Sequence, residues 1–326
     1  MGGVRPRGTF AAVSDTAVAV ASRSFSRNAI LRHELLERYP GSRFNDEGPT
    51  VLAGDALARF LRGHGKAITG LDVLSDDVFA AVPELRIVSK YGVGLDMIDL
   101  AAARRRGVSV RWTPGVNRQA VAELTIAFMI ALGRSLVPLA RELADGGWRR
   151  PGGRQLSTST VGVVGCGHVG QQVARLCAAF GARVVAYDIR AYDDFYRASG
   201  VTPVSLDALL AGADIVTLHV PLDASTRGMI GAREIARMKA SAFLINTARG
   251  GIVDEAALKS ALVEHRLAGA ALDVFATEPP VDRELLALPT FLGTPHIGGS
   301  TEEAVLAMGR AAIAGLDDPG RQIVDE

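Results

Sequence analysis

The chain has 326 residues, enough for two domains of ordinary size, and its hydrophobic content of 48% supports a large buried core. The formal net charge of +1 provides no overall field that would attract nucleic acid or an acidic membrane surface. The two cysteines, Cys166 and Cys177, match no metal-ligand spacing and no disulfide framework, and they favour a reducing compartment. Residues 1–15 lack the apolar core of a signal peptide, and the most apolar helical segment, 120–132, is too short to span a bilayer. We therefore predict a cytoplasmic protein without a metal and without a nucleic-acid or membrane partner.

The first third of the chain alternates short apolar runs with helical patterns. Strands are expected at residues 17–21, 66–69, 85–89 and 108–112, and helices at 29–38, 55–62, 76–82 and 100–106. Strands that alternate with helices favour a parallel sheet with helices on both of its faces. No dinucleotide fingerprint occurs in this part, so the unit is a candidate for gripping a substrate.

Two features of this unit have two interpretations each. Residues 22–27, SRSFSR, follow the first strand, and their hydroxyls and arginines could bind an anionic group such as phosphate or phosphonate. The same residues could equally form a solvated helix start that Ser26 caps. Lys90, at the end of the strand 85–89, is either a surface charge or a substrate contact.

A turn-forming segment, TPGVN at 113–117, marks the first crossing between two domains. The helix expected after it, 119–136, has an apolar face broader than one packing partner needs. This breadth suggests burial against another subunit or between domains. Residues 145–153 are expected to form a loop.

The segment 161–188 has the pattern of a dinucleotide-binding unit. A short apolar strand at 161–165 leads into G-x-G-x-x-G, formed by Gly165, Gly167 and Gly170, and a helical pattern follows to residue 180. The first glycine permits a tight turn, the second lets backbone approach a pyrophosphate, and the third lets the helix pack on the strand. The free N–H groups at the helix start can hold phosphates. A second strand ends at Asp188, whose carboxylate can accept hydrogen bonds from ribose hydroxyls.

Four more strands are expected after this unit, at 215–220, 242–247, 270–275 and 291–293. With the first two they make six strands, which is the number in a complete doubly wound sheet. A last helix, 301–315, is expected to return to the first domain. We therefore predict an α/β fold in which a Rossmann-type domain, 118–298, is inserted into a flavodoxin-like substrate domain, 1–117 plus 299–326.

Three polar side chains follow successive strands of the second domain: Arg249, Glu278 and His296. Each one taken alone has an ordinary structural interpretation. Ligands of open parallel sheets bind beyond the carboxyl ends of the strands, so these side chains should converge where a nicotinamide arrives. Taken together, they favour a catalytic site.

The motifs YGVGLDMID, VGVVGCGHVG, INTARGGIVDE, ALDVFATEPP and TPHIGG occur together between about residues 86 and 300. With them the chain resembles the D-specific 2-hydroxyacid dehydrogenase family, in particular its phosphoglycerate-dehydrogenase-like branch. The resemblance implies NAD as cofactor, a homodimer formed through residues 119–136, and Arg249, Glu278 and His296 as the catalytic set. It also implies that the backbone N–H groups of Val93 and Gly94, together with Arg249, bind the substrate carboxylate. Cofactor contacts are implied for residues of the glycine turn and of the strand ends: Gly165, Gly167, His168, Val169, Gly170, Asp188, Val220, Pro221, Thr226, Thr247, Ala248 and Asp273.

These residue types fit hydride transfer at C2 of a small D-2-hydroxy or 2-keto acid. His296 would move the proton at the C2 oxygen, Glu278 would orient the imidazole, and Arg249 would bind the carboxylate and polarise the carbonyl. Asp188 favours NAD over NADP, because a 2′-phosphate would meet a like charge. The alternative is a non-catalytic, NAD(H)-sensing interaction protein on the same scaffold, which need not retain these three side chains.

Overall fold

The computed structural model describes residues 17–317. It contains a five-stranded and a seven-stranded sheet, both parallel, so the predicted α/β class is confirmed. Backbone contacts divide the chain into two compact units, one of residues up to Val116 and from Val305 on, the other of Asn117–Ala304. The sequence placed these boundaries at 117/118 and 298/299. The predicted absence of a signal peptide concerns residues 1–15, which lie outside the described part.

The first unit is built on the five-stranded sheet. Its strands run in the order β2-β1-β3-β4-β5, which is the flavodoxin-like order 2-1-3-4-5 that the prediction requires. The bounds of the strands are β1 Val18–Val20, β2 Arg43–Phe44, β3 Lys66–Thr69, β4 Ile87–Lys90 and β5 Ser109–Arg111. The sequence did not predict β2, because two residues at a sheet edge are too short to produce an alternating pattern.

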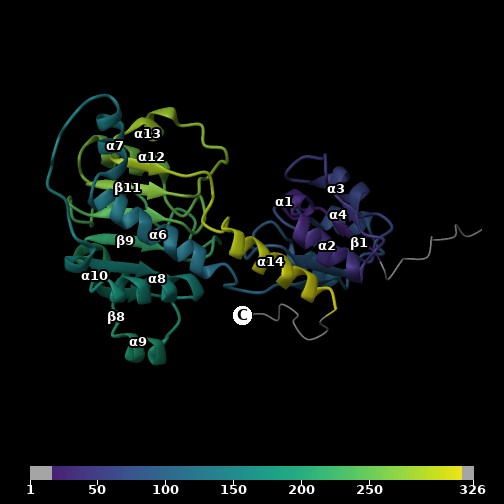
Figure 1. Cartoon of the computed structure of the whole chain (residues 1–326). Helices are drawn as coiled ribbons and strands as arrows, with labels where there is room; N and C mark the ends of the chain where they lie inside the picture. The colour runs from purple at the N-terminus through teal and green to yellow at the C-terminus, as the bar shows by residue number, and fades with distance from the viewer. Residues whose placement is uncertain (1–16, 318–326) are drawn as a thin grey trace, which may run out of the picture. The chain divides into compact units, whose positions relative to one another are not determined.

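Helices cover both faces of this sheet (Figure 1). Their bounds are α1 Arg23–Arg27, α2 Ala29–Arg38, α3 Gly54–Leu61, α4 Asp76–Ala81, α5 Leu100–Arg105 and α14 Glu302–Gly315. The idea that Ser26 caps a helix is wrong. Ser26 is buried and donates to the carbonyl of Ser22 at 2.9 Å, whereas the Ser22 hydroxyl accepts from the N–H of Phe25 and caps α1.

The second unit is built on the seven-stranded sheet, in the order β12-β11-β10-β9-β6-β7-β8. Counted from β6, this is the doubly wound order 3-2-1-4-5-6 with one further strand, β12, at the edge. The bounds are β6 Thr160–Val164, β7 Arg183–Tyr187, β8 Thr202–Pro203, β9 Ile215–Leu218, β10 Phe243–Asn246, β11 Gly269–Leu272 and β12 Phe291–Gly293. All six predicted strands are present. The strand that was missed, β8, is an exposed two-residue edge strand that contains a proline.

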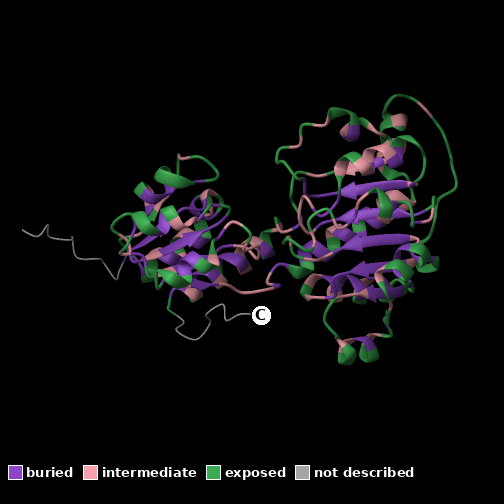
Figure 2. Ribbon diagram, turned by 180° about the vertical axis from the view of Figure 1, so that it is seen from behind, coloured by how far each residue is buried: buried purple, intermediate pink, exposed green. Residues whose placement is uncertain are grey.

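Figure 2 shows that the strands of this sheet are the buried layer, with exposed helix surfaces on either side. One face is covered by α6 Arg118–Gly133 and α8 His168–Ala179, and the other by α10 Leu206–Gly212, α11 Ala232–Ile235, α12 Glu255–Val263 and α13 Arg283–Ala287. The remaining helices are α7 Leu136–Ala144, the short 3-10 helix η1 Leu156–Thr158 and α9 Asp193–Ser199.

The helix predicted over 119–136 ends at Gly133, and a second helix, α7, begins at Leu136. Ser135 lies in the left-handed region with φ of 50°, and the axes of α6 and α7 differ by 62°. Most apolar residues of α6 are buried against α8 and the sheet of the same unit, so its breadth does not require a second subunit. Within residues 17–317 no single helix is long and apolar enough to cross a membrane; only the bent pair of α6 and α7, taken together, meets that length and composition.

Candidate active site

The three glycines of the fingerprint occupy three different environments in the turn between β6 and α8. Gly165 has φ of +89°, and an added Cβ would lie 2.7 Å from the backbone of His219 and Val220. An added Cβ on Gly170 would lie 2.0 Å from the carbonyl oxygen of Gly165. An added Cβ on Gly167 would meet nothing within 4 Å. The turn is therefore closed on its protein side and open at Gly167, where a pyrophosphate can approach the backbone.

Other residues predicted to contact the cofactor surround this turn. His168 and Val169 form the start of α8, with Gly167 as its N-cap. Asp188 follows β7 and folds back, so that its Oδ2 accepts from the N–H of Cys166 at 2.6 Å. The other oxygen, Oδ1, accepts from the N–H of Arg190 at 2.8 Å. The carboxylate is thus fixed beside the glycine turn, as ribose binding requires.

The residues that follow β9 and β10 lie, like the glycine turn after β6, at the carboxyl ends of the strands. Val220 and Pro221 follow β9, and the Thr226 hydroxyl closes that loop by donating to the Pro221 carbonyl at 2.6 Å. After β10, the Thr247 hydroxyl lies 2.9 Å from that of Thr125 on α6. The N–H of Ala248 donates to the Asn246 side chain at 3.0 Å. The loops that carry these predicted cofactor residues are therefore held by bonds within the second unit.

Asp273, at the end of β11, organises the loop that carries the candidate acid-base. Its carboxylate is buried and accepts from the Thr294 hydroxyl at 2.5 Å, from the N–H of Ile297 at 2.8 Å and from the N–H of Gly298 at 2.7 Å. Its backbone carbonyl accepts from the N–H of His296 at 2.8 Å. The sequence assigned Asp273 to the cofactor and missed this anchoring, which no local pattern reveals because the partners are more than twenty positions away.

His296 is held in an uncommon conformation. Its φ of 53° lies in the left-handed region, a costly position that a non-glycine residue keeps only where surrounding bonds enforce it. Its Nδ1 lies 2.9 Å from Oε2 of Glu278. The other Glu278 oxygen accepts from the N–H of Phe275 at 3.1 Å. The carboxylate thereby fixes the ring and leaves Nε2 for a substrate.

The pair changes the proton affinity of both partners. The hydrogen bond from Glu278 raises the pKa of His296, against partial burial and the Arg249 charge, which act to lower it. Burial raises the pKa of Glu278, but the bonds to His296 and to the Phe275 N–H outweigh burial, so the pKa is lowered overall. In contrast, burial lowers the pKa of His219 to about 3, which keeps that imidazole neutral and unsuited to acid-base work near neutral pH.

Arg249 joins this pair from the loop after β10. Its positive charge is among the influences that lower the pKa of both Glu278 and His296. The loop itself packs closely, since an added Cβ on Gly250 would lie 1.8 Å from the carbonyl oxygen of Phe275. The Arg249 Nη1 also donates to the Ala248 carbonyl at 2.7 Å. The three strand-end side chains that the sequence singled out therefore meet at one edge of the seven-stranded sheet.

Val93 and Gly94, predicted to bind the substrate, lie in the first unit. They belong to the loop after β4, in which the N–H groups of residues 92–94 have no acceptor within the described part of the chain. Lys90, at the end of β4, is not a surface charge: only 4% of it is exposed, and its ammonium donates to the carbonyls of Gly70 and Tyr91. That interpretation is wrong because the strand ends beneath this loop rather than in solvent.

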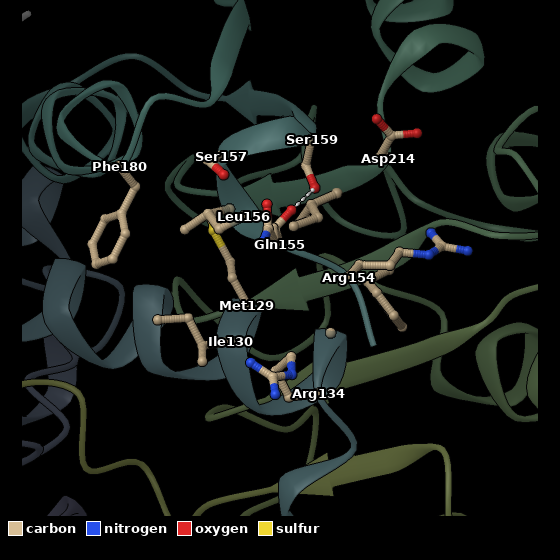
Figure 3. A pocket seen from close by; sticks show the side chains of 13 residues that line it. Met129, Ile130, Arg134, Arg154, Gln155, Leu156, Ser157, Ser159, Phe180 and Asp214 are labelled. Atoms are coloured by element: carbon tan, nitrogen blue, oxygen red, sulfur yellow. Dashed lines mark hydrogen bonds between the residues drawn. The ribbon is translucent and has the colours of Figure 1, made fainter. Parts of the chain in front are cut away.

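A separate cavity of about 260 Å³ lies at the opposite ends of the strands of the seven-stranded sheet. Figure 3 shows Arg134, Arg154 and Asp214 around it, with Met129 and Phe180 among the apolar lining residues. Asp214 precedes β9, so the cavity is at the amino ends of the strands. Across residues 17–317, no group of three or more His, Cys, Asp and Glu side chains could hold a metal ion.

Comparison with known proteins decides the family. Residues 126–298 match the model of the D-isomer specific 2-hydroxyacid dehydrogenase, NAD binding domain. The chain belongs to this family. It is thus a member of a family of NAD-dependent oxidoreductases, and the segment with the glycine turn is its NAD-binding domain, as predicted.

Individual relatives agree with this assignment. The D-3-phosphoglycerate dehydrogenase of Methanocaldococcus jannaschii is 42% identical over 236 residues, which are 72% of this chain and 45% of that protein. The hydroxypyruvate reductase of Thermotoga maritima is 40% identical over 238 residues, 72% of this chain and 77% of that protein. The matches thus span less than half of the D-3-phosphoglycerate dehydrogenases and about three quarters of the reductase.

Solved structures show the same fold. The D-lactate dehydrogenase of Aquifex aeolicus, complexed with NAD and lactic acid, has a TM-score of 0.78 at 26% identity, covering 91% of this chain and 93% of that one. A glyoxylate reductase from Paecilomyes thermophila has a TM-score of 0.82 at 27% identity, with coverages of 91% and 93%.

Proposed function

We propose that this chain interconverts a small D-2-hydroxy acid and the corresponding 2-keto acid. When bound, NAD supplies or accepts the hydride that is exchanged with C2 of the substrate. The observation that carries the proposal is the bonded pair of His296 and Glu278, with the loop that holds Arg249 packed against the loop that leads to Glu278. A non-catalytic NAD-sensing protein would have no need for this arrangement.

The three side chains have distinct tasks in this proposal. His296 donates a proton from Nε2 to the substrate oxygen during reduction and removes it during oxidation. Glu278 holds Nδ1 at 2.9 Å, which fixes the ring and favours its charged form. Arg249 presents a planar pair of donors that bind the carboxylate and polarise the adjacent carbonyl. The backbone N–H groups of Val93 and Gly94 bind the same carboxylate.

The test is NADH oxidation against a panel of 2-keto acids that includes hydroxypyruvate, glyoxylate, and phosphorylated and phosphonylated keto acids. We expect turnover with at least one member, its loss in His296→Ala, and unchanged NADH binding in that variant. NADH binding without turnover on any member would favour the NAD-sensing alternative. Running the panel with NADPH tests the preference that Asp188 predicts, and equal efficiency with both cofactors would contradict it.

We further propose that the substrate carries a second anionic group that meets the segment after β1. Ser22 and Ser26 are buried and bonded, whereas Ser24 is exposed, with its hydroxyl 3.4 Å from that of Tyr91. The Nε of Arg23 is buried and has no hydrogen-bond partner in the described residues, while Arg27 donates to the Asp46 carbonyl at 3.4 Å. Arg23→Ala should reduce the preference for phosphorylated over plain keto acids. An unchanged preference in both Arg23→Ala and Arg27→Ala would remove the segment from substrate binding.

A homodimer is also proposed, through the region of α6 and α7. No residue of α7 is buried, and Leu136 and Leu143 are 50% and 57% exposed. Leu143→Glu should convert the dimer to a monomer in light scattering. Val263→Glu is the matched control, because Val263 is 58% exposed on α12 instead. A Leu143→Glu variant that stays dimeric would exclude α7 from the interface.

A further inference from the structure

The loop of residues 92–94, which follows β4, is held at the carbonyl of Val93 and at the carbonyl of Tyr91 just before it. The indole N–H of Trp112 donates to the carbonyl of Val93 at 2.8 Å. The ammonium of Lys90 donates to the carbonyl of Tyr91 at 3.4 Å and also to that of Gly70. Both side chains come from the ends of neighbouring strands, since β4 and β5 pair in parallel with Ser89 opposite Arg111.

Fixing these carbonyls also fixes the N–H groups that follow them. A trans peptide unit is planar, so its C=O and N–H point in opposite directions. A Tyr91 carbonyl directed at Lys90 turns the N–H of Gly92 the other way, and a Val93 carbonyl directed at Trp112 does the same for Gly94. Neighbouring backbone N–H groups can form an anion-binding site, and the N–H of Val93 belongs to the peptide unit between these two, whose orientation both of them restrict. The N–H groups of residues 92–94 have no acceptor among the described residues, as such a site requires.

The Lys90 contact lies in the core of the first unit. Lys90 is 4% exposed, and the neighbouring Asp72 is fully buried, with its oxygens accepting from the N–H groups of Leu52 at 3.0 Å and Gly70 at 2.9 Å. A buried ammonium needs such nearby acceptors and a countercharge to be tolerated. Gly92 has φ of +117°, a conformation that favours glycine, and an added Cβ would lie at ordinary contact distance, 3.5 Å, from Nζ, so the loop runs directly over the lysine.

We propose that Trp112 and Lys90 are positioning residues that hold the loop 92–94 in the form that binds a carboxylate. They act through the loop backbone and do not touch the substrate. This inference rests on the proposed function in one respect, namely that the anion held by the loop is the substrate's carboxylate. The sequence assigned no role to Trp112, and it left Lys90 as either a surface charge or a substrate contact.

The first test measures anion binding without turnover. Oxalate is titrated by calorimetry into the enzyme saturated with NADH. Trp112→Phe keeps the aromatic ring and removes the N–H donor, so the oxalate Kd should rise about three- to tenfold, the worth of one neutral hydrogen bond. The NADH Kd should not change. Tyr39→Phe is the matched control. It also removes a hydrogen-bond donor from an aromatic ring, but that donor bonds Asp317, away from the loop.

Lys90→Met forms the second arm, with Lys66→Met as its control. Lys66 is a partly buried lysine of the adjacent strand β3, where it donates to the Tyr39 hydroxyl at 3.0 Å, away from the loop. Lys90→Met should weaken oxalate at least as much as Trp112→Phe does, and Lys66→Met should leave the Kd unchanged. If Lys90→Met does not fold, the tryptophan variant decides by itself.

The outcomes separate this inference from the proposed function. A wild-type oxalate Kd in Trp112→Phe overturns the positioning role, and so does a wild-type enzyme that binds no oxalate. If the wild type binds oxalate and Trp112→Phe weakens it, but no 2-keto acid is turned over, the positioning role stands and the proposed function fails. With an active substrate, Trp112→Phe should raise KM about three- to tenfold with kcat nearly unchanged. A fall in kcat with an unchanged KM would contradict the inference.

Discussion

Replacing Glu278 with glutamine tests the pairing on which the proposed chemistry depends. The change keeps the shape of the side chain and removes the charge that lies 2.9 Å from Nδ1 of His296. A hydrogen bond to a charged group is worth about 1.5–3 kcal/mol. The side chains of His296 and Glu278 are 39% and 37% exposed, so solvent screening places this pair at the low end, about 1.5 kcal/mol. That energy corresponds to a loss of about tenfold in kcat.

The dependence on pH should move in a defined direction. Glu278 raises the pKa of His296, so without the carboxylate the imidazolium persists only to a lower pH. Reduction needs the protonated ring, and its rate should therefore decline at a lower pH in Glu278→Gln than in the wild type. Oxidation needs the neutral ring, and its rate should rise at a lower pH.

The assay is kcat and kcat/KM in both directions from about pH 5 to about pH 9. Glu255→Gln serves as the control, since the Glu255 carboxylate accepts from the N–H of Ala276 in the adjacent loop at 2.6 Å rather than from the histidine. A Glu278→Gln enzyme with the wild-type profile in both directions would refute the assignment of Glu278 as the partner that tunes His296.

Three further outcomes are expected. His296→Ala and Arg249→Ala should each lower kcat by at least about 10², with NADH affinity retained, as measured by steady-state kinetics and fluorescence titration. Gly167→Ala should weaken NADH binding with little change in Tm, because an added Cβ there would face open space. Gly170→Ala should lower Tm, because the added Cβ would lie 2.0 Å from the Gly165 carbonyl oxygen. The reverse pattern would contradict our interpretation of the turn. The stability that the His296–Glu278 pair contributes is fully present above the ordinary pKa of glutamate, 4.5, and below the ordinary pKa of histidine, 6.5. The Tm difference between wild type and Glu278→Gln should therefore peak between these pH values. It should decline as the pH rises through the raised pKa of His296.

The sequence by itself determined the α/β class, the glycine turn and the family, because these are written in contiguous residues. The motif from Gly165 to Gly170 combines backbone freedom, close packing and open approach at fixed spacing, and each glycine occupies the environment that its position predicts. Arg249, Glu278 and His296 were singled out as candidates by the same logic, since each one follows a buried strand and the carboxyl ends of parallel strands lie together. Short edge elements such as β2 and β8 escaped, because two residues carry no periodicity.

Only the tertiary structure decided how those side chains are held and which groups support them. Asp273 fastens the His296 loop across more than twenty positions of sequence, and Trp112 reaches the Val93 carbonyl nineteen positions away. The breadth of α6 is likewise accounted for by its packing on α8 and the sheet. Such contacts are set by the order of strands in a sheet, and strand order depends on long-range packing rather than on any local run of residues.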